Sequence, residues 1–271
     1  MNINLKFLLL ETTLSLIPNF LYAQCSPAQN CAELGYIETS NKGGCLKCPF
    51  GNGWYCPDSK EEKAILGECS GYAKNCKIGD ILNSDGTCTT DKASGKTPIG
   101  VVIAVKDDCG WAITANPVAQ GTPWSTKPNY TVLPINSGNI ANVYDNCEYT
   151  KIITAEGNNN EFPAAWAAIN YAPTAAPETK GKWCLPAPGI MNDLFPYLNE
   201  VNNAIAKLSG TVLTAQIGPE SYVDRNEHLW LSVEGDNLNA YYFCAACPTF
   251  ISNTAKKNYL TTFTVRPVLA F

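Results

Sequence analysis

The side chains best suited to chemistry lie near the C-terminal end of the chain. His228 is the single histidine, and Cys244 and Cys247 form a Cys-x-x-Cys pair. A Ser–His or Cys–His relay has only this one base available, and a redox pair needs a helix N-terminus or a similar group to lower a thiol pKa. The pair instead follows a strand-like aromatic run, 241–243. We therefore expect that Cys244 and Cys247 either form a local disulfide or arose together by diversification of the codons in this region. His228 is expected to have a structural role, and no catalytic residues are expected.

Metal sites have little support in the sequence. Cys45-Leu46-Lys47-Cys48 has the spacing that opens many zinc sites. No histidine lies near it, and residues 1–23 predict export to a compartment where disulfides persist, so disulfides are favoured. The triplets with which sugar-binding C-type lectins hold calcium are absent, and Asp145-Asn146 is typical of a turn. We expect no bound metal and no cofactor.

The cysteines indicate the compartment. All thirteen follow residue 24, and residues 1–23 combine a lysine, an apolar segment and a terminal Ala23, which predicts a secretory signal peptide cleaved after Ala23. Disulfides persist outside the cytoplasm. We expect secretion, surface display or a periplasmic location, and no membrane span, since no other segment is apolar for about 18 residues.

Charge excludes one class of partner. The formal net charge is −5, and only 16% of the 271 residues are charged. Nucleic-acid binding usually requires a basic patch, so no nucleic-acid partner is expected. An unidentified macromolecule, protein or glycan, is the expected ligand.

The sequence divides into two parts. Residues 24–90 hold eight cysteines among many turn residues, which predicts a small module stabilised by four disulfides. Residues 89–98 have the composition of a linker. A larger domain is expected over 95–271, where Ile99–Val105 and Trp111–Thr114 predict a strand hairpin.

The larger domain is predicted to be α+β. One helix begins at Pro163 and ends near Tyr171, and a second spans about 190–208 with a kink at Pro196. Residues 115–160 are expected to form long loops. Strands follow over 228–233, 239–245 and 259–270, without the alternation that a parallel α/β sheet requires.

An ordered set of motifs resembles the bacterial collagen-like-protein C-terminal domain family. The motifs are Phe-Pro-Ala-Ala at 162–165, Gly-Lys-Trp-Cys-Leu-Pro at 181–186, Leu-Trp-Leu-Ser-Val-Glu at 229–234 and Val-Arg-Pro-Val-Leu-Ala-Phe at 265–271. The family's usual forms are Tyr-Pro-Ala-Ala, Trp-Tyr-Leu-Pro-Ser, Tyr-Trp-Ser-Ser-Thr-Glu and the same Val-Arg-Pro ending. The resemblance covers about 95–271 and implies a C-type-lectin-like fold.

The chain departs from the family pattern at Leu231 and Val233, which replace Ser and Thr, at Tyr241, where a Trp is common, and throughout the stretch 235–255. The stretch 235–255 lacks Lys, Glu, Gln, Met and Trp throughout. Some members of the fold class that the chain resembles are targets of diversity-generating retroelements, which randomise the adenines of Asn codons and do not produce these five residues. This predicts a variable recognition surface, as on a secreted receptor or adhesin. The alternative is a structural subunit or adhesin of a surface appendage without such a site.

The expected recognition surface combines a strand face with the segment that follows it. Leu229, Leu231 and Val233 alternate with Trp230 and Ser232, so they are expected to form an exposed apolar row. Trp230, Glu234, Val265 and Arg266 keep the family pattern and are expected to be scaffold. The full set of predicted ligand-binding residues is Leu229, Leu231, Val233, Gly235, Asp236, Asn239, Tyr241, Tyr242, Asn253 and Asn258.

Overall fold

The chain forms two units, Met1–Lys63 and Ala64–Phe271. A computed structural model describes residues 36–38, 46–47, 54–60, 65–69, 73–107, 109–127, 129–132, 140–144, 146–214, 228–245, 247, 251–255 and 263–271. In the first unit, β1 (Tyr36–Glu38), β3 (Trp54–Lys60) and β2 (Leu46–Lys47) pair antiparallel in that order. The predicted signal peptide and the Cys45–Cys48 pair lie outside the described residues.

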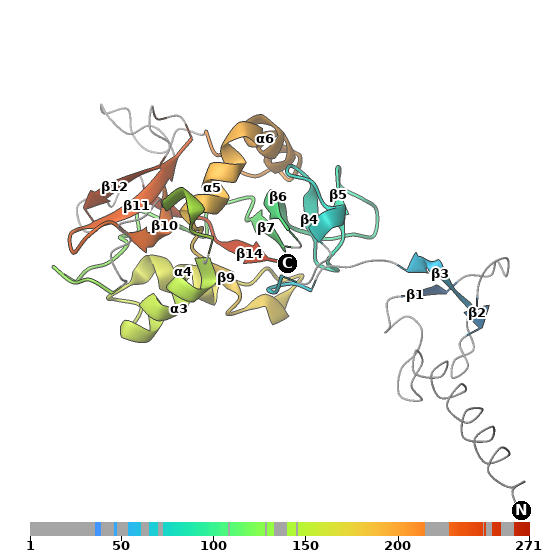
Figure 1. Ribbon diagram of the computed structural model, residues 1–271, viewed down its shortest axis with the longest axis horizontal. Coiled ribbons are helices and arrows are strands. Elements are labelled where there is room, and N and C mark those ends of the chain that lie inside the picture. The colour runs from blue at the N-terminus through green and yellow to red at the C-terminus, as the bar shows by residue number, and fades with distance from the viewer. Residues whose placement is uncertain are drawn as a thin grey trace, which may run out of the picture. The chain divides into compact units, whose positions relative to one another are not determined.

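The second unit contains two sheets (Figure 1). One has the order β5-β4-β6-β7-β14-β9, and the other has the order β12-β11-β10-β13-β8. Only β10 and β13 pair parallel among the described strands, which confirms an α+β domain rich in antiparallel strands. The bounds in chain order are β4 (Ile81–Asn83), β5 (Cys88–Thr89), β6 (Pro98–Lys106), β7 (Cys109–Ile113), β8 (Ala119–Gln120), β9 (Trp183–Cys184), β10 (His228–Glu234), β11 (Asn239–Cys244), β12 (Ile251–Ala255), β13 (Phe263–Val265) and β14 (Val268–Ala270).

The predicted helices are present, and proline sets their bounds. Pro163 occupies the first turn of α4 (Pro163–Asn170), where its missing N–H costs no helical hydrogen bond. The predicted second helix is divided as expected: α5 (Pro188–Leu194) passes through the 3-10 turn η4 (Phe195–Tyr197), which contains Pro196, into α6 (Leu198–Lys207). Further 3-10 turns are η1 (Ala73–Asn75), η2 (Ile140–Asn142) and η3 (Pro177–Thr179). Among the described helices, none is long and apolar enough to cross a bilayer.

One helix was not predicted. α3 (Asn146–Glu156) lies inside the stretch expected to be loops. Its sequence has few apolar residues at helical spacing, and tertiary contacts hold it in place. Ile153 is buried, the Leu185 N–H donates a hydrogen bond to Thr150 Oγ1 at 3.1 Å, and a disulfide joins Cys147 to Cys184 in β9.

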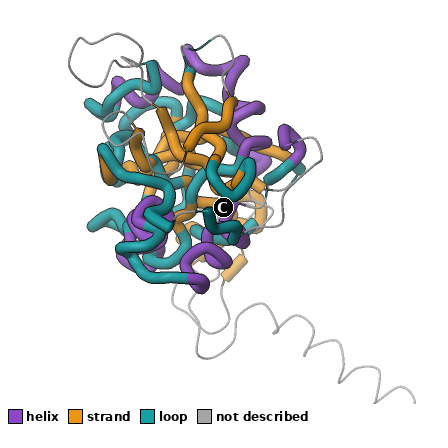
Figure 2. The backbone as a smooth tube through the Cα atoms, turned by 90° about the vertical axis from the view of Figure 1, so that its left-hand side faces the viewer, coloured by secondary structure: helices purple, strands orange, loops and turns teal. Residues whose placement is uncertain are grey.

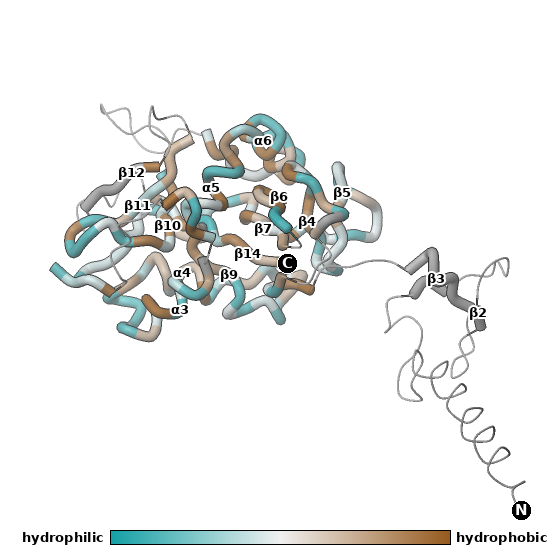
Figure 3. Tube along the Cα trace, in the orientation of Figure 1, coloured by the Kyte–Doolittle hydropathy of each residue, from teal (hydrophilic) through white to brown (hydrophobic). Residues whose placement is uncertain are grey.

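The apolar residues form three buried clusters around the two sheets. One cluster joins α5 and α6 to β6, β7 and one face of β10. A second includes Leu82, Val102, Trp183 and Phe271, and a third joins α3 and α4 to Trp230 and Phe263. Strands occupy the middle of the unit, with helices and loops around them (Figure 2). Hydrophobic and hydrophilic positions alternate along α6 (Figure 3), as expected of a helix with one buried face.

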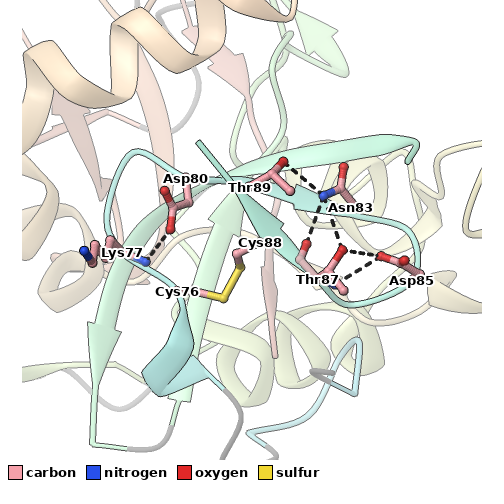
Figure 4. The surroundings of a disulfide bond; sticks show 8 residues. All are labelled: Cys76, Lys77, Asp80, Asn83, Asp85, Thr87, Cys88 and Thr89. Carbon is pink, nitrogen blue, oxygen red and sulfur yellow. Dashed lines mark hydrogen bonds between the residues drawn. A yellow bond between two sulfur atoms is a disulfide. The ribbon is translucent and has the colours of Figure 1, made fainter. Parts of the chain in front are cut away.

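The boundary between the two parts differs from the predicted one. Residues 81–89 form β4 and β5, which pair in the sheet of the larger unit. The expected linker is a loop between two strands of that sheet. Disulfides reflect the same division: Cys69 bonds to Cys109, and Cys76 bonds to Cys88 (Figure 4). Cys69, Cys76 and Cys88, three of the eight N-terminal cysteines, therefore belong to the larger unit. Cys69 also pairs with a cysteine outside the predicted module.

The turn between β4 and β5 depends on Asp85 (Figure 4). Burial raises the pKa of its carboxyl, but hydrogen bonds from Lys96 and from the side chain and N–H of Thr87, together with the Lys96 charge, outweigh burial and lower the pKa to about 2. The Lys96 Nζ lies 2.5 Å from Asp85 Oδ2. The carboxylate therefore organises the turn only while it is ionised.

We expect the stabilisation from Asp85 to disappear in acid. A carboxyl with a lowered folded-state pKa stabilises the fold fully above its unfolded value of 3.8, and the contribution falls as the pH drops towards about 2. Asp85→Asn should lose about 1 kcal/mol at pH 6, because the ion pair is partly exposed. Urea unfolding of both proteins at pH 6 and pH 2.5 measures the difference, which should shrink at the lower pH. A difference that stays constant would contradict this role.

Candidate functional site

The predicted recognition residues lie on the hairpin formed by β10 and β11, but its first strand is buried. Leu229, Leu231 and Val233 are only 0–2% exposed, so the expected exposed row is wrong. β10 lies between β11 and β13. Its Leu229 and Leu231 side chains pack in the cluster with α5 and α6, and Trp230 packs in the cluster with α3 and α4. Both faces are covered, and the near-continuous apolar run at 229–233 is typical of such a strand.

The four residues predicted to be scaffold are buried. Trp230 stacks on Phe263 with ring centroids 4.1 Å apart, and its Nε1 donates a hydrogen bond to the Thr122 carbonyl at 2.6 Å. Glu234 Oε2 accepts a hydrogen bond from the Val132 N–H at 2.7 Å. Arg266 donates to the Thr211 carbonyl, and Val265 lies in the cluster with Trp230. These contacts fix the frame from which the hairpin projects.

The hairpin tip is preorganised by Asp236. Its Oδ1 accepts hydrogen bonds from the N–H groups of Leu238 and Asn239 at 2.7 and 2.8 Å, and both carboxylate oxygens accept from Asn239 Nδ2. These hydrogen bonds lower the pKa of Asp236, and the bond from the Asn239 side chain has the largest effect. Asp236 and Asn239 therefore shape the turn, as Asx turns do. They also hold Leu238 outward, 53% exposed.

Sequence reasoning missed Leu238. Gly235, Asp236 and Asn239 flank it and were all predicted to bind ligand, but the exposed side chain among them is the leucine. The signal was available: a leucine between two asparagines at a hairpin turn has no apolar neighbour in sequence. A single exposed apolar side chain is ordinary on a protein surface; Leu238 is singled out because it lies at the tip of the hairpin that also bears the partly accessible Tyr241 and Tyr242.

The two tyrosines of β11 are half-buried on opposite sides of the sheet. Tyr241 packs beside the cluster that contains Leu229 and Leu231. Tyr242 packs against the other cluster, with its ring 5.0 Å from the His228 ring and 5.3 Å from that of Phe263. Each tyrosine keeps part of its surface in solvent. Each therefore combines support from the core with an accessible edge.

Two strands of the segment 235–255, β11 and β12, lie on one side of β10 in the five-stranded sheet. β12 is the edge strand, and Asn253 pairs with Tyr241 in the register between β11 and β12. β11 and β12 lie at one end of the second unit, and β4 and β5 lie at the other (Figure 1). Asn258 lies outside the described residues. The structure thus brings Gly235, Asp236, Asn239, Tyr241, Tyr242 and Asn253 onto one hairpin-and-edge element.

A histidine and two cysteines meet at the opposite end of the hairpin from its tip. His228 pairs with Cys244 across β10 and β11, and the turn after β11 returns Cys247, whose N–H donates to the Cys244 carbonyl at 3.3 Å. Cys244 and Cys247 form a disulfide, one of the two outcomes expected from the sequence. The Cys247 Sγ lies 3.8 Å from His228 Nε2. A potential ligand atom from each of the three residues falls within 4.8 Å of the other two.

A separate cavity of about 500 Å³ lies between the end of β7 and the end of α6. Its lining includes Tyr171, Pro173, Pro117 and Leu208. Polar groups in the lining bond mainly to one another or to the adjacent loop: Thr114 Oγ1 donates to the Asn116 carbonyl, and Asn116 Oδ1 accepts from Thr211. The cavity is therefore a mainly apolar hollow with few available polar groups.

Comparisons with known proteins identify no family for the chain. No family model and no curated protein matches the chain, so the resemblance to the collagen-like-protein C-terminal domain family stays a prediction. Among solved structures, the chain is similar to a fimbrial protein from Bacteroides ovatus ATCC 8483. The identity is 15% and the TM-score is 0.45, over 72% of this chain and 48% of that chain. The chain thus spans about half the length of this structural neighbour.

Proposed function

We propose that the chain is an extracytoplasmic binding protein that recognises a macromolecule through the tip and outer edge of the β10–β11–β12 element. One observation carries the proposal: the tip presents Leu238, 53% exposed, from a turn that Asp236 fixes with hydrogen bonds to the backbone. Preorganised loops on a rigid scaffold lose little conformational entropy on binding. Catalysis is not part of the proposed function.

The composition of the contact surface supports a macromolecular ligand. An exposed leucine and the accessible edges of Tyr241 and Tyr242 lie near small polar residues, a combination found in adaptable paratopes. An aliphatic side chain at the tip favours a protein ligand over a glycan, since it offers no hydrogen bond to a sugar. The disulfides of the larger unit support a location outside the cytoplasm.

Diversification of this element is the finer part of the proposal. The described part of 235–255 comprises the hairpin tip, β11 and the edge strand β12. Variation is expected at its exposed and half-buried positions, whereas Ala240, Phe243 and Cys244 are buried and are expected to stay fixed. An adenine-rich near-copy of these codons beside a reverse transcriptase gene in the encoding genome would support it. The alternative function, a structural subunit or adhesin of a surface appendage, requires no such copy.

We expect Leu238→Ser to weaken binding of the full chain to its ligand about tenfold, the loss typical of a central apolar anchor. The labelled full chain is applied to a glycan array and to an array of purified extracellular-matrix proteins. Binding to any target is then compared between the wild type, the variant and Ile65→Ser.

Ile65→Ser is the matched control, because Ile65 is an exposed aliphatic residue (52%) outside the hairpin. It should leave binding unchanged. Targets held equally by the wild type and both variants would show that the tip is not the recognition surface.

A further inference from the structure

We propose that His228, Cys244 and Cys247 form a binding site for a thiophilic divalent cation of the zinc class when the Cys244–Cys247 disulfide is reduced. This site lies at the end of the hairpin away from Leu238. It provides two thiolates and one imidazole, a donor set suited to a borderline-soft cation.

The backbone brings the three donors together. His228 and Cys244 are cross-strand partners in the antiparallel pair β10–β11, where facing Cβ atoms lie about 4.5–5.5 Å apart. The turn that follows β11 then returns Cys247 to the same place, fixed by its N–H bond to the Cys244 carbonyl. A Cys-x-x-Cys turn is also the usual chelating unit of zinc sites.

The distances are close to those of a coordinated ion. His228 Nε2 lies 3.8 Å from Cys247 Sγ, and a donor atom from each residue falls within 4.8 Å of the other two. Tetrahedral zinc, with Zn–S of about 2.3 Å and Zn–N of about 2.0–2.1 Å, places its ligand atoms about 3.5–3.8 Å apart. Small side-chain rotations therefore close the site once the sulfurs are no longer bonded.

The surroundings hold the imidazole in place, and among the described residues of the site Cys247 is the one in contact with solvent. The His228 ring stacks on Phe263 at 5.1 Å and meets the edge of Tyr242 at 5.0 Å, and the Thr264 hydroxyl donates to the His228 carbonyl. Cys244 is fully buried, whereas Cys247 is half-buried. An ion would enter beside Cys247 and keep a water as its fourth ligand, as three-ligand zinc sites do.

The disulfide and the metal exclude each other. A trialkylphosphine reduces the disulfide: the S–S bond breaks, each sulfur gains a proton, and the phosphine takes an oxygen from water to become its oxide. Binding of the dication then releases both thiol protons to solvent, while neutral His228 donates its Nε2 lone pair. A small-molecule disulfide such as oxidised glutathione reverses this: its own S–S bond breaks, it takes up the two electrons and two protons from solvent and leaves as two thiols, the Cys244–Cys247 bond re-forms, and the ion, having lost both sulfur ligands, returns to solvent. The site thus responds to the redox state of its surroundings.

Site-resolved alkylation tests the proposal on the full chain. After limited phosphine reduction, the protein is treated with iodoacetamide with and without Zn²⁺, and the modified cysteines are mapped by peptide mass spectrometry. We expect Zn²⁺ to slow alkylation of Cys244 and Cys247 at least tenfold, while Cys76 and Cys88 remain unaffected. His228→Gln should remove most of this protection, and Cys45→Ser/Cys48→Ser, which removes the other Cys-x-x-Cys pair, should not.

Equal alkylation of Cys244 and Cys247 with and without Zn²⁺ would overturn the proposal, as would undiminished protection in His228→Gln. Circular dichroism of the reduced proteins verifies that each is folded. If His228→Gln does not fold, the wild-type contrast between the Cys244–Cys247 and Cys76–Cys88 pairs decides the outcome.

Discussion

Leu231→Ala should lower the free energy of unfolding by about 2–5 kcal/mol. Leu231 is fully buried in β10 and packs with α5 and α6, so truncation removes apolar contacts and leaves a cavity that the surrounding strands cannot close. Chemical denaturation monitored by tryptophan fluorescence measures the loss. The effect is large because β10 is paired with a strand on each side, β11 and β13, and is covered on both faces.

Leu238→Ala is the matched control for Leu231→Ala. The same substitution at the exposed tip of the same hairpin should change the free energy of unfolding by less than about 0.5 kcal/mol. If the two variants behaved alike, or if Leu238→Ala were the more destabilised, the division of the hairpin into a buried strand and an exposed tip would be wrong.

Removing the Cys147–Cys184 disulfide should lower the free energy of unfolding by about 3–4 kcal/mol, the chain-entropy value for a loop of this length. Its sequence separation is 37 residues, and it anchors α3 to β9. Cys147→Ala/Cys184→Ala is compared with the wild type by urea unfolding. Hydrogen exchange should also become faster in α3 than in α4, because the sequence of α3 gives it little support of its own.

The Cys76–Cys88 bond provides the comparison. It closes a separation of 12 residues, so Cys76→Ala/Cys88→Ala should lose less, about 2–3 kcal/mol, and leave α3 exchange unchanged. A loss below 1 kcal/mol for the Cys147–Cys184 variant, or unaltered exchange in α3, would contradict the anchoring role.

Local signals predicted much of the larger unit. Proline at position 163 and the apolar spacing over 190–208 located α4, α5 and α6, and Pro196 located their division. Period-two and β-branched runs located β6, β7, β10 and β11. The predicted single strand near the C-terminus is two, β13 and β14, in different sheets. α3 escaped prediction because a disulfide and buried contacts, rather than periodicity, stabilise it.

The candidate site was predicted less well, because the sequence does not show whether one or both faces of β10 are covered by other elements. Alternation shows which residues of a strand share a face, but it does not show whether that face meets solvent or a second layer. Leu229 and Leu231 were assigned to the surface because Trp230 was assigned to the core; the structure buries both sets. The position of β4 and β5 was missed for a related reason, since pairing with β6 depends on contacts distant in sequence.

Hydroxyl-radical footprinting of the full chain, alone and with a target found on the arrays, tests the central claim most directly. The claim is that recognition occurs at the hairpin tip and outer edge while β10 is scaffold. It predicts strong labelling of Leu238 and Tyr241 in the free protein, protection of both in the complex, and little labelling of Leu229 and Leu231 in either state. Labelling of Leu229 and Leu231 at the rate of Leu238, or a target that leaves Leu238 and Tyr241 unprotected, would contradict it.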